Sequence, residues 1–147
     1  METTTYAIHL LKGLSDIPFG CSMETAEQLL GKPDEVESFD DELYDSQKIT
    51  VFYYANAELS LYFEGEDTFS FTSVEAGVNN ITLFEKPLHS LNKKGIIALM
   101  KEKGYPDFET EEETWGEKRL SFDDGLIDFY FQNDQLHSVN WSADTDI

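Results

Sequence analysis

A weak internal repeat is the feature that most constrains how this chain can fold. The segment Gly31-Lys32-Pro33-Asp34 is matched by Gly104-Tyr105-Pro106-Asp107, and apolar residues at helical spacing precede each of them. Glycine just past the last turn closes a helix, and a proline two residues later prevents its continuation. We therefore predict two helices that start after the N-caps Ser22 and Asn92 and end before these glycines.

A second pair of matched segments has the pattern of strands. Residues 59–64 (LSLYFE) and 127–132 (IDFYFQ) alternate with period two, which places three apolar side chains on one face of each. Other β-rich runs are residues 49–54, 69–74, 81–84, 119–122 and 136–141. Turn residues at 64–67 and 123–125 favour short hairpin connections, which make consecutive strands antiparallel. Residues 74–80 are either the end of a strand or a long loop.

The order of these elements predicts an α+β fold made of two tandem units, each a helix followed by three or four antiparallel strands. The halves span about residues 17–86 and 88–141 and are expected to share a core within one domain of residues 1–147. A shared core is expected because each half is too small to be comfortably stable alone. The alternative is that the two glycine-proline segments match by chance.

The charge of the chain narrows the class of partner. With 30 acidic and 10 basic residues the formal net charge is −20, yet 40% of residues are hydrophobic and 14% are aromatic, so the chain is expected to fold. The excess is spread along the sequence and belongs to the folded surface. Such a surface repels nucleic acid and anionic lipid and attracts cationic proteins. We expect a basic protein partner, with no direct nucleic-acid binding and no membrane binding.

The start of the chain and its single cysteine favour the cytoplasm. Residues 1–14 read METTTYAIHLLKGL, which lacks the basic start and continuous apolar stretch of a signal peptide. Cys21 alone forms no internal disulfide and no cysteine-based zinc cluster, as is usual in a reducing compartment. It precedes the first predicted helix, where it is either a reactive thiol or, as we favour, a small apolar filler.

Residues that carry catalysis or hold cofactors are not evident in the sequence. His9, His89 and His137 lack the spacing of a metal pair, and the usual nucleophile, phosphate-loop and dinucleotide motifs are missing. We expect no catalytic residue, no cofactor and no metal site. His137 alternates with Val139 and Trp141, so we expect it to share their face and to line a surface for a partner.

Acidic clusters and aromatic residues are the candidate partner-binding groups. The acidic clusters follow the two predicted helix ends and are expected in loops before the first strand of each half. Acidic loops also protect sheet edges and maintain solubility, so a structural or adaptor domain is the alternative, and an enzyme with unrecognised sites is a further one. Tryptophan beside carboxylates is typical of an interface for an arginine- and lysine-rich surface. The candidates are Asp40, Asp41, Glu42, Glu109, Glu111, Glu112, Glu113, Trp115, His137 and Trp141.

The sequence also resembles a known group of proteins. Ile17-Pro18-Phe19-Gly20, the helical residues 23–30 and Gly31-Lys32-Pro33-Asp34, followed by strands and a second copy, resemble the tandem helix-plus-sheet proteins similar to the β-lactamase inhibitor protein. Small acidic immunity proteins of bacterial toxin systems look similar. The resemblance implies inhibition by occlusion, in which a concave sheet face or an acidic loop covers the partner's active site. The expected function is a cytoplasmic immunity or inhibitor protein that neutralises a basic effector, such as a cognate nuclease toxin.

Overall fold

Strands predominate in the structure. The computed structural model describes residues 5–40 and 47–144, and within them it contains two sheets and two α-helices, α1 (Met23–Leu30) and α2 (Lys93–Glu102). Two short 3₁₀ segments, η1 (Leu88–Ser90) and η2 (Asp123–Gly125), lie in connections. The predicted α+β class is confirmed, with more sheet than helix.

The larger sheet has eight strands, all paired in antiparallel fashion. Along the chain α1 is followed by four of them and α2 by the other four, and β7 and β13 meet at the centre. From one edge to the other the strands are β10 (Glu109–Glu112), β11 (Glu117–Phe122), β12 (Ile127–Gln132), β13 (Gln135–Ser142), β7 (Phe69–Gly77), β6 (Leu59–Gly65), β5 (Lys48–Tyr54) and β4 (Glu35–Asp40).

The smaller sheet brings together the start and the middle of the chain. Its strands are, in order, β3 (Ile17–Pro18), β2 (Gly13–Leu14), β1 (Tyr6–His9), β8 (Ile81–Leu83) and β9 (Lys86–Pro87). β1 and β8 run parallel, with Ile8 opposite Leu83. The expectation that residues 81–84 extend the antiparallel strands of the first half is therefore wrong. The long-range partner β1, whose strand pattern the sequence analysis missed, draws this segment away from the larger sheet.

Both predicted helices start and end where the local signals place them. The Ser22 side chain accepts a hydrogen bond from the Thr25 backbone N–H at 3.1 Å, and Asn92 Oδ1 accepts one from the Gly95 N–H at 2.9 Å. Gly31 and Gly104 each have φ of 97°, a conformation that favours glycine over residues with a side chain. The caps and the glycine stops are confirmed.

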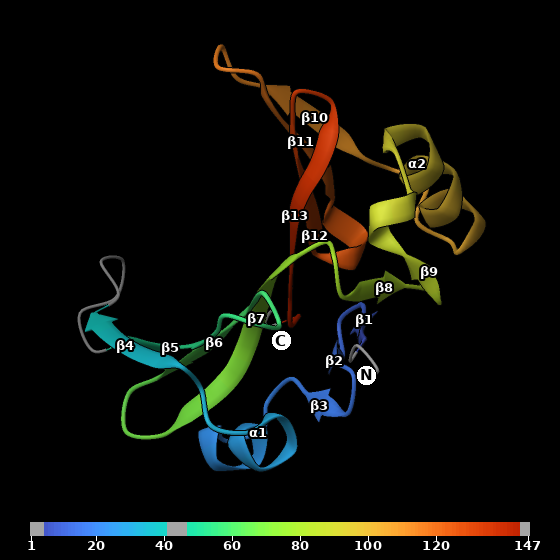
Figure 1. Cartoon of the computed structure of the whole chain (residues 1–147). Helices are drawn as coiled ribbons and strands as arrows, with labels where there is room; N and C mark the ends of the chain where they lie inside the picture. The colour runs from blue at the N-terminus through green and yellow to red at the C-terminus, as the bar shows by residue number, and fades with distance from the viewer. Residues whose placement is uncertain (1–4, 41–46, 145–147) are drawn as a thin grey trace.

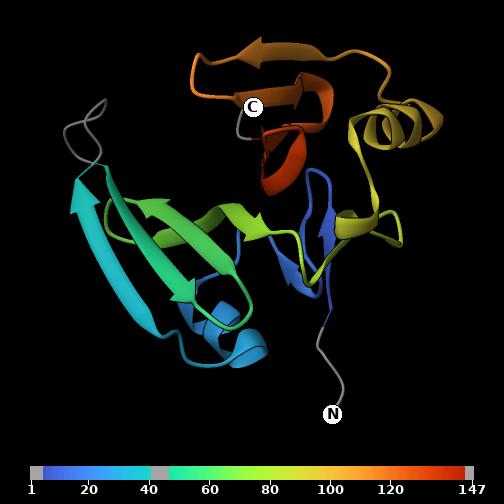
Figure 2. The ribbon, with the colours of Figure 1, turned by 45° about the horizontal axis from the view of Figure 1, so that its top comes forward.

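One side of the larger sheet is covered and the other is not. In Figure 1, α1 lies below β4–β7 and α2 lies to the right of β10–β13, while the sheet bends so that its opposite side, toward the upper left, carries no helix. Figures 1 and 2 both place the smaller sheet between the two helices. The main core fills the covered side; its largest fully buried side chains include Phe63, Phe71, Phe122, Phe129 and Trp141. We call the uncovered side the open face.

Candidate functional site

Trp141 lies in the core rather than on a binding surface. Its relative exposure is 0%, and its indole Nε1 donates a hydrogen bond to the backbone oxygen of Gly13 at 2.9 Å. The side chain thus joins β13 of the larger sheet to β2 of the smaller one. The prediction that Trp141 contacts a partner is wrong, because a large apolar side chain with one polar atom is stable in the core when that atom has an acceptor.

His137 is on the side of β13 opposite to the one predicted. A β-bulge opposite Tyr130 and Phe131 shifts the register, so that Tyr130 pairs with Ser138 while Phe131 pairs with Leu136. The extra residue, His137, is exposed, whereas Trp141 is buried. A bulge turns one side chain out of the simple alternation, which explains why period two gave the wrong face. His137 lines a hollow on the open face and remains a candidate contact.

The first acidic cluster is only partly described. Asp40 is the last residue of β4 and is exposed, opposite Lys48 in the register with β5. Alternation places Asp40 on the same side of β4 as Ser38. The Ser38 hydroxyl hydrogen-bonds the Thr50 hydroxyl at 3.0 Å, and both residues lie on the covered side of the sheet. Asp41 and Glu42 lie outside the described residues. Asp40 therefore belongs to an edge strand and not to a loop, and its side chain is not on the open face.

The second acidic cluster forms the opposite edge of the sheet. Glu109, Glu111 and Glu112 lie in β10, which the sequence analysis placed in a loop. Glu111 Oε2 lies 2.8 Å from Arg119 Nη2, and Glu112 Oε1 lies 3.4 Å from Lys118 Nζ. Alternation puts Glu109 and Glu111 on the open face and Glu112 on the other side. Glu113 follows the strand, and its backbone N–H donates to the Glu117 carbonyl in the turn to β11.

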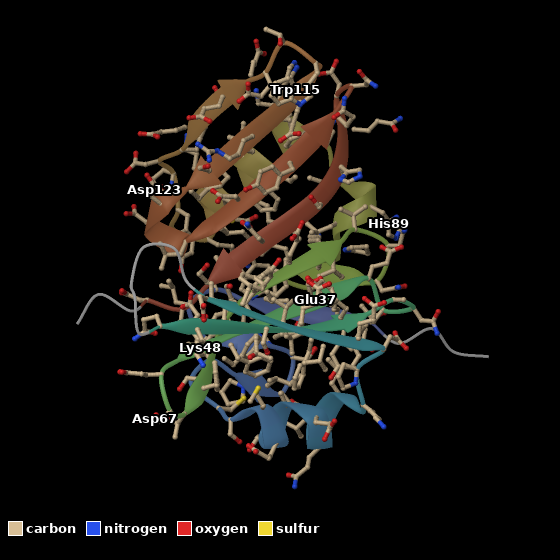
Figure 3. All side chains as sticks on the ribbon, turned by 90° about the vertical axis from the view of Figure 1, so that its left-hand side faces the viewer. Glu37, Lys48, Asp67, His89, Trp115 and Asp123 are labelled. Carbon is tan, nitrogen blue, oxygen red and sulfur yellow. The ribbon has the colours of Figure 1, made fainter. Side chains whose placement is uncertain are left out.

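Trp115 is an exposed aromatic at the tip of the β10–β11 hairpin. It is 63% exposed, and its Nε1 lies 3.3 Å from Glu117 Oε2. The Gln132 side chain donates to the Trp115 backbone oxygen at 3.1 Å, which fixes the turn against β12. Figure 3 places Trp115 at the far upper end of the molecule. Of the two predicted tryptophan anchors, this one is accessible to a partner.

A continuous row of polar side chains crosses the open face. It passes through directly opposed residues on every strand of the larger sheet, and the sequence analysis included only one of them, Glu109, among its candidates. The alternating strands do reveal these residues, because they occupy the positions that face solvent. The alternation was used only to identify the core residues. From β4 to β10 the row is Glu35, Tyr53, Ser60, Glu75, Asn140, Asp128, Ser121 and Glu109.

Tyrosines on this face are hydrogen-bonded to carboxylates. The Tyr53 hydroxyl donates to Glu37 Oε2 at 3.2 Å, and the Tyr62 hydroxyl donates to Glu75 Oε2 at 3.3 Å. Partial burial, with the nearby charge of Glu75, raises the pKa of Tyr62 to about 12. Burial and the charge of Asp128 likewise raise the pKa of Tyr130. These hydroxyls therefore stay protonated, and the face presents neutral aromatic rings beside ionised carboxylates.

Negative charge prevails on the open face. Among the described residues, alternation assigns one cation to it, Arg119, and that guanidinium is paired with Glu111. Interspersed polar and aromatic side chains separate the carboxylates but do not neutralise them. A continuous field of one sign raises the local concentration of oppositely charged partners. The carboxylates are those of Glu35, Glu37, Glu64, Glu75, Glu109, Glu111, Glu117 and Asp128.

A hollow lies where the two halves of the larger sheet meet. It is open to solvent, has a volume of about 370 Å³, and takes its lining from β7, β11, β12 and β13. Its lining includes Glu75, Tyr130, His137, Ser138 and Asn140. With Glu117 and Phe131, which also line it, the hollow combines aromatic rings, hydrogen-bonding groups and two carboxylates.

Neither the grouping of potential metal ligands nor the setting of Cys21 in the described residues indicates a reactive site. Across residues 5–40 and 47–144, no three His, Cys, Asp or Glu side chains lie together as a metal site. Burial raises the pKa of the Cys21 thiol, and this side chain packs against the core. The filler interpretation of Cys21 therefore fits better than that of a reactive thiol, and the expectation that the chain has no catalytic centre stays a prediction.

Comparisons with other proteins add no further constraint. No family model, curated protein or solved structure matches the chain. In the part of the chain that the structure describes, no helix is long and apolar enough to cross a membrane. The chemistry of the open face is therefore the main indication of function.

Proposed function

We propose that this chain is a non-catalytic binding protein whose open face docks on a basic protein and occludes it, in the manner of a cytoplasmic inhibitor or immunity protein. The observation that carries the proposal is the composition of one uninterrupted sheet face, where the described residues include many carboxylates and tyrosines and one cation, Arg119. Tyrosine next to carboxylate provides both a flat contact area and a charge that a lysine- or arginine-rich surface complements.

We infer that this face is built from two copies of a helix-then-strands unit, of about residues 17–86 and 88–141. In support, each α-helix is followed by a run of antiparallel strands in the same order. A β-bulge also recurs at matching places, opposite Tyr62 and Phe63 in one half and opposite Tyr130 and Phe131 in the other. A β-bulge is a specific feature that redirects side chains, so bulges at matching positions favour a common origin of the two halves.

A basic effector such as a nuclease toxin is the class of target that fits this surface. The active site of such an enzyme would use lysines and arginines to bind phosphate groups. The carboxylates of the open face would occupy the place of those phosphates. Long-range attraction then speeds encounter, while buried aromatic contacts slow dissociation. No chemistry is required of this chain.

The test distinguishes the effect of the position of the charges from the effect of the net charge. The protein is recovered with its bound partner from the native host, the partner is purified, and binding kinetics are measured at several salt concentrations. One variant carries Glu37→Lys and Asp128→Lys on the open face. The control carries Glu27→Lys and Glu102→Lys on the exposed sides of α1 and α2. Both variants change the net charge equally.

We expect the open-face variant to slow association by about tenfold or more at low salt and the control variant to change it much less. The on-rates should converge as salt rises, because charges are screened over about 8 Å at physiological ionic strength. If both variants slow association equally, only net charge matters. If neither does, and salt has no effect, the acidity serves solubility, and the structural or adaptor interpretation replaces the proposal.

A further inference from the structure

One carboxylate stands at the junction of the two halves of the larger sheet. Glu75 lies on β7, directly opposite Ser60 on β6 and Asn140 on β13. It is exposed, and it lines both the central hollow with Tyr130 and a neighbouring hollow with Glu58. Two carboxylates line the central hollow, Glu75 and Glu117, and of these Glu75 lies on one of the two central strands, where a centrally docked partner meets it.

A tyrosine from each half flanks this carboxylate. The Tyr62 hydroxyl donates to Glu75 Oε2 at 3.3 Å, which restrains the carboxylate from the β6 side. On the other side Tyr130 lines the same hollow together with Asn140. Both tyrosines sit at the β-bulges, which increase the local twist and turn the neighbouring side chains. The carboxylate is therefore restrained by one tyrosine and shares a hollow with the ring of another.

We propose that this junction is a subsite for one arginine side chain of the basic partner, with the guanidinium on the Glu75 carboxylate and against the ring of Tyr130. The inference rests on the proposed function and adds the identity of the central contact. A guanidinium is planar, forms paired hydrogen bonds to a carboxylate and stacks on aromatic rings. A lysine ammonium is a compact point charge, which any carboxylate of the open face can pair with as well as Glu75 can. The junction should therefore prefer arginine.

The test uses hexa-arginine and hexa-lysine peptides as probes. Binding is followed by the backbone amide shifts of the isotope-labelled protein, for the wild type and two variants. Glu75→Gln removes the central charge, and Glu64→Gln, on β6 of the same face, is the matched control with the same net charge. Both residues are exposed, and the amide spectrum reports directly whether each variant is folded.

We expect the arginine peptide to bind the wild type about tenfold more tightly than the lysine peptide, with the largest shifts at Glu75, Tyr130 and Asn140. Glu75→Gln should abolish this preference, and Glu64→Gln should retain it. Equal binding of both peptides across the open face, with the two variants alike, would overturn the arginine subsite and leave the proposed function intact. Shifts confined to residues outside the open face would overturn both.

Discussion

Replacement of Trp141 by phenylalanine tests whether this side chain holds the two sheets together. Trp141 is fully buried on β13, and its Nε1 donates to the Gly13 oxygen of β2 at 2.9 Å. These residues are 128 positions apart in the sequence, so the bond closes a long-range contact. On β3, the residue opposite Gly13 is Pro18, which has no N–H to donate. The indole therefore supplies a donor that β3 does not.

The expected loss of stability follows from two contributions. Truncating a large aromatic core residue to alanine costs about 3–5 kcal/mol, and phenylalanine keeps most of the ring, so the packing loss is about 1 kcal/mol. Leaving a buried carbonyl without its donor costs about 1–3 kcal/mol. Trp141→Phe should therefore lower the free energy of unfolding by about 2–4 kcal/mol, a large share of the stability of an ordinary domain.

Urea unfolding followed by far-ultraviolet circular dichroism measures this loss independently of tryptophan fluorescence. The matched control is Trp115→Phe, because Trp115 is 63% exposed and is expected to change the free energy by no more than about 0.5 kcal/mol. Fluorescence provides a second check: the Trp115→Phe protein, which keeps Trp141, should emit at shorter wavelength than the Trp141→Phe protein. A loss below about 1 kcal/mol for Trp141→Phe, or equal losses for the two variants, would refute the argument.

Three further predictions concern local features. Asn92→Ala removes the acceptor for the Gly95 N–H and should lower the free energy of unfolding by about 1 kcal/mol in urea titrations. Gly104→Ala places a side chain at φ 97° and should cost about 1–2 kcal/mol in the same assay; an unchanged midpoint would contradict the helix-end argument. Tyr62 has a pKa raised from 10.0 to about 12, so the folded protein keeps a proton that the unfolded chain loses, and stability falls as pH rises from 10.0 through about 12. Tyr62→Phe should make that alkaline fall smaller, as measured by urea titrations on both sides of pH 10.0; an identical fall would contradict the shift.

Helix ends and the alternating strands were predictable because their signals are local. Ser22 and Asn92 as caps, and Gly31 and Gly104 as stops, depend on backbone groups within a few residues. Alternation in residues 59–64 and 127–132 identified the core side correctly, since Leu59, Leu61, Phe63 and their counterparts are buried. The hairpins near residues 64–67 and 123–125 also form where turn residues cluster.

The edge strands were not predictable from local preference. β4 and β10 are exposed along their whole length and rich in glutamate, a residue that is infrequent in strands. They are strands because β5 and β11 offer partners for their backbones, for example Glu37 opposite Val51 and Glu111 opposite Arg119. Pairing of this kind depends on the tertiary structure, so a propensity argument places the same residues in loops.

The candidate site was only partly accessible from sequence for a related reason. The face on which His137 lies depends on a β-bulge. The burial of Trp141 depends on a contact with Gly13, which is distant in the sequence. Glu75 did leave a signal, as the one charged residue of β7, between Val74 and Ala76, but nothing in the sequence places it next to Asn140. Non-local strand pairing brings these residues together.

The position of the carboxylates distinguishes protection of the sheet from recognition of a partner. An exposed edge strand presents unpaired N–H and C=O groups, and charged side chains there prevent pairing with another copy. This role applies to Glu35 and Glu37 on β4 and to Glu109 and Glu111 on β10, in addition to any part they take in binding a partner. It does not account for Glu75, on a central strand whose backbone is paired on both sides. Solubility alone would be served there by a neutral polar residue such as the opposing Ser60, without added repulsion in an already acidic protein. The central carboxylate, held by a tyrosine, is therefore a feature that edge protection leaves unexplained and that the proposed cationic partner would explain.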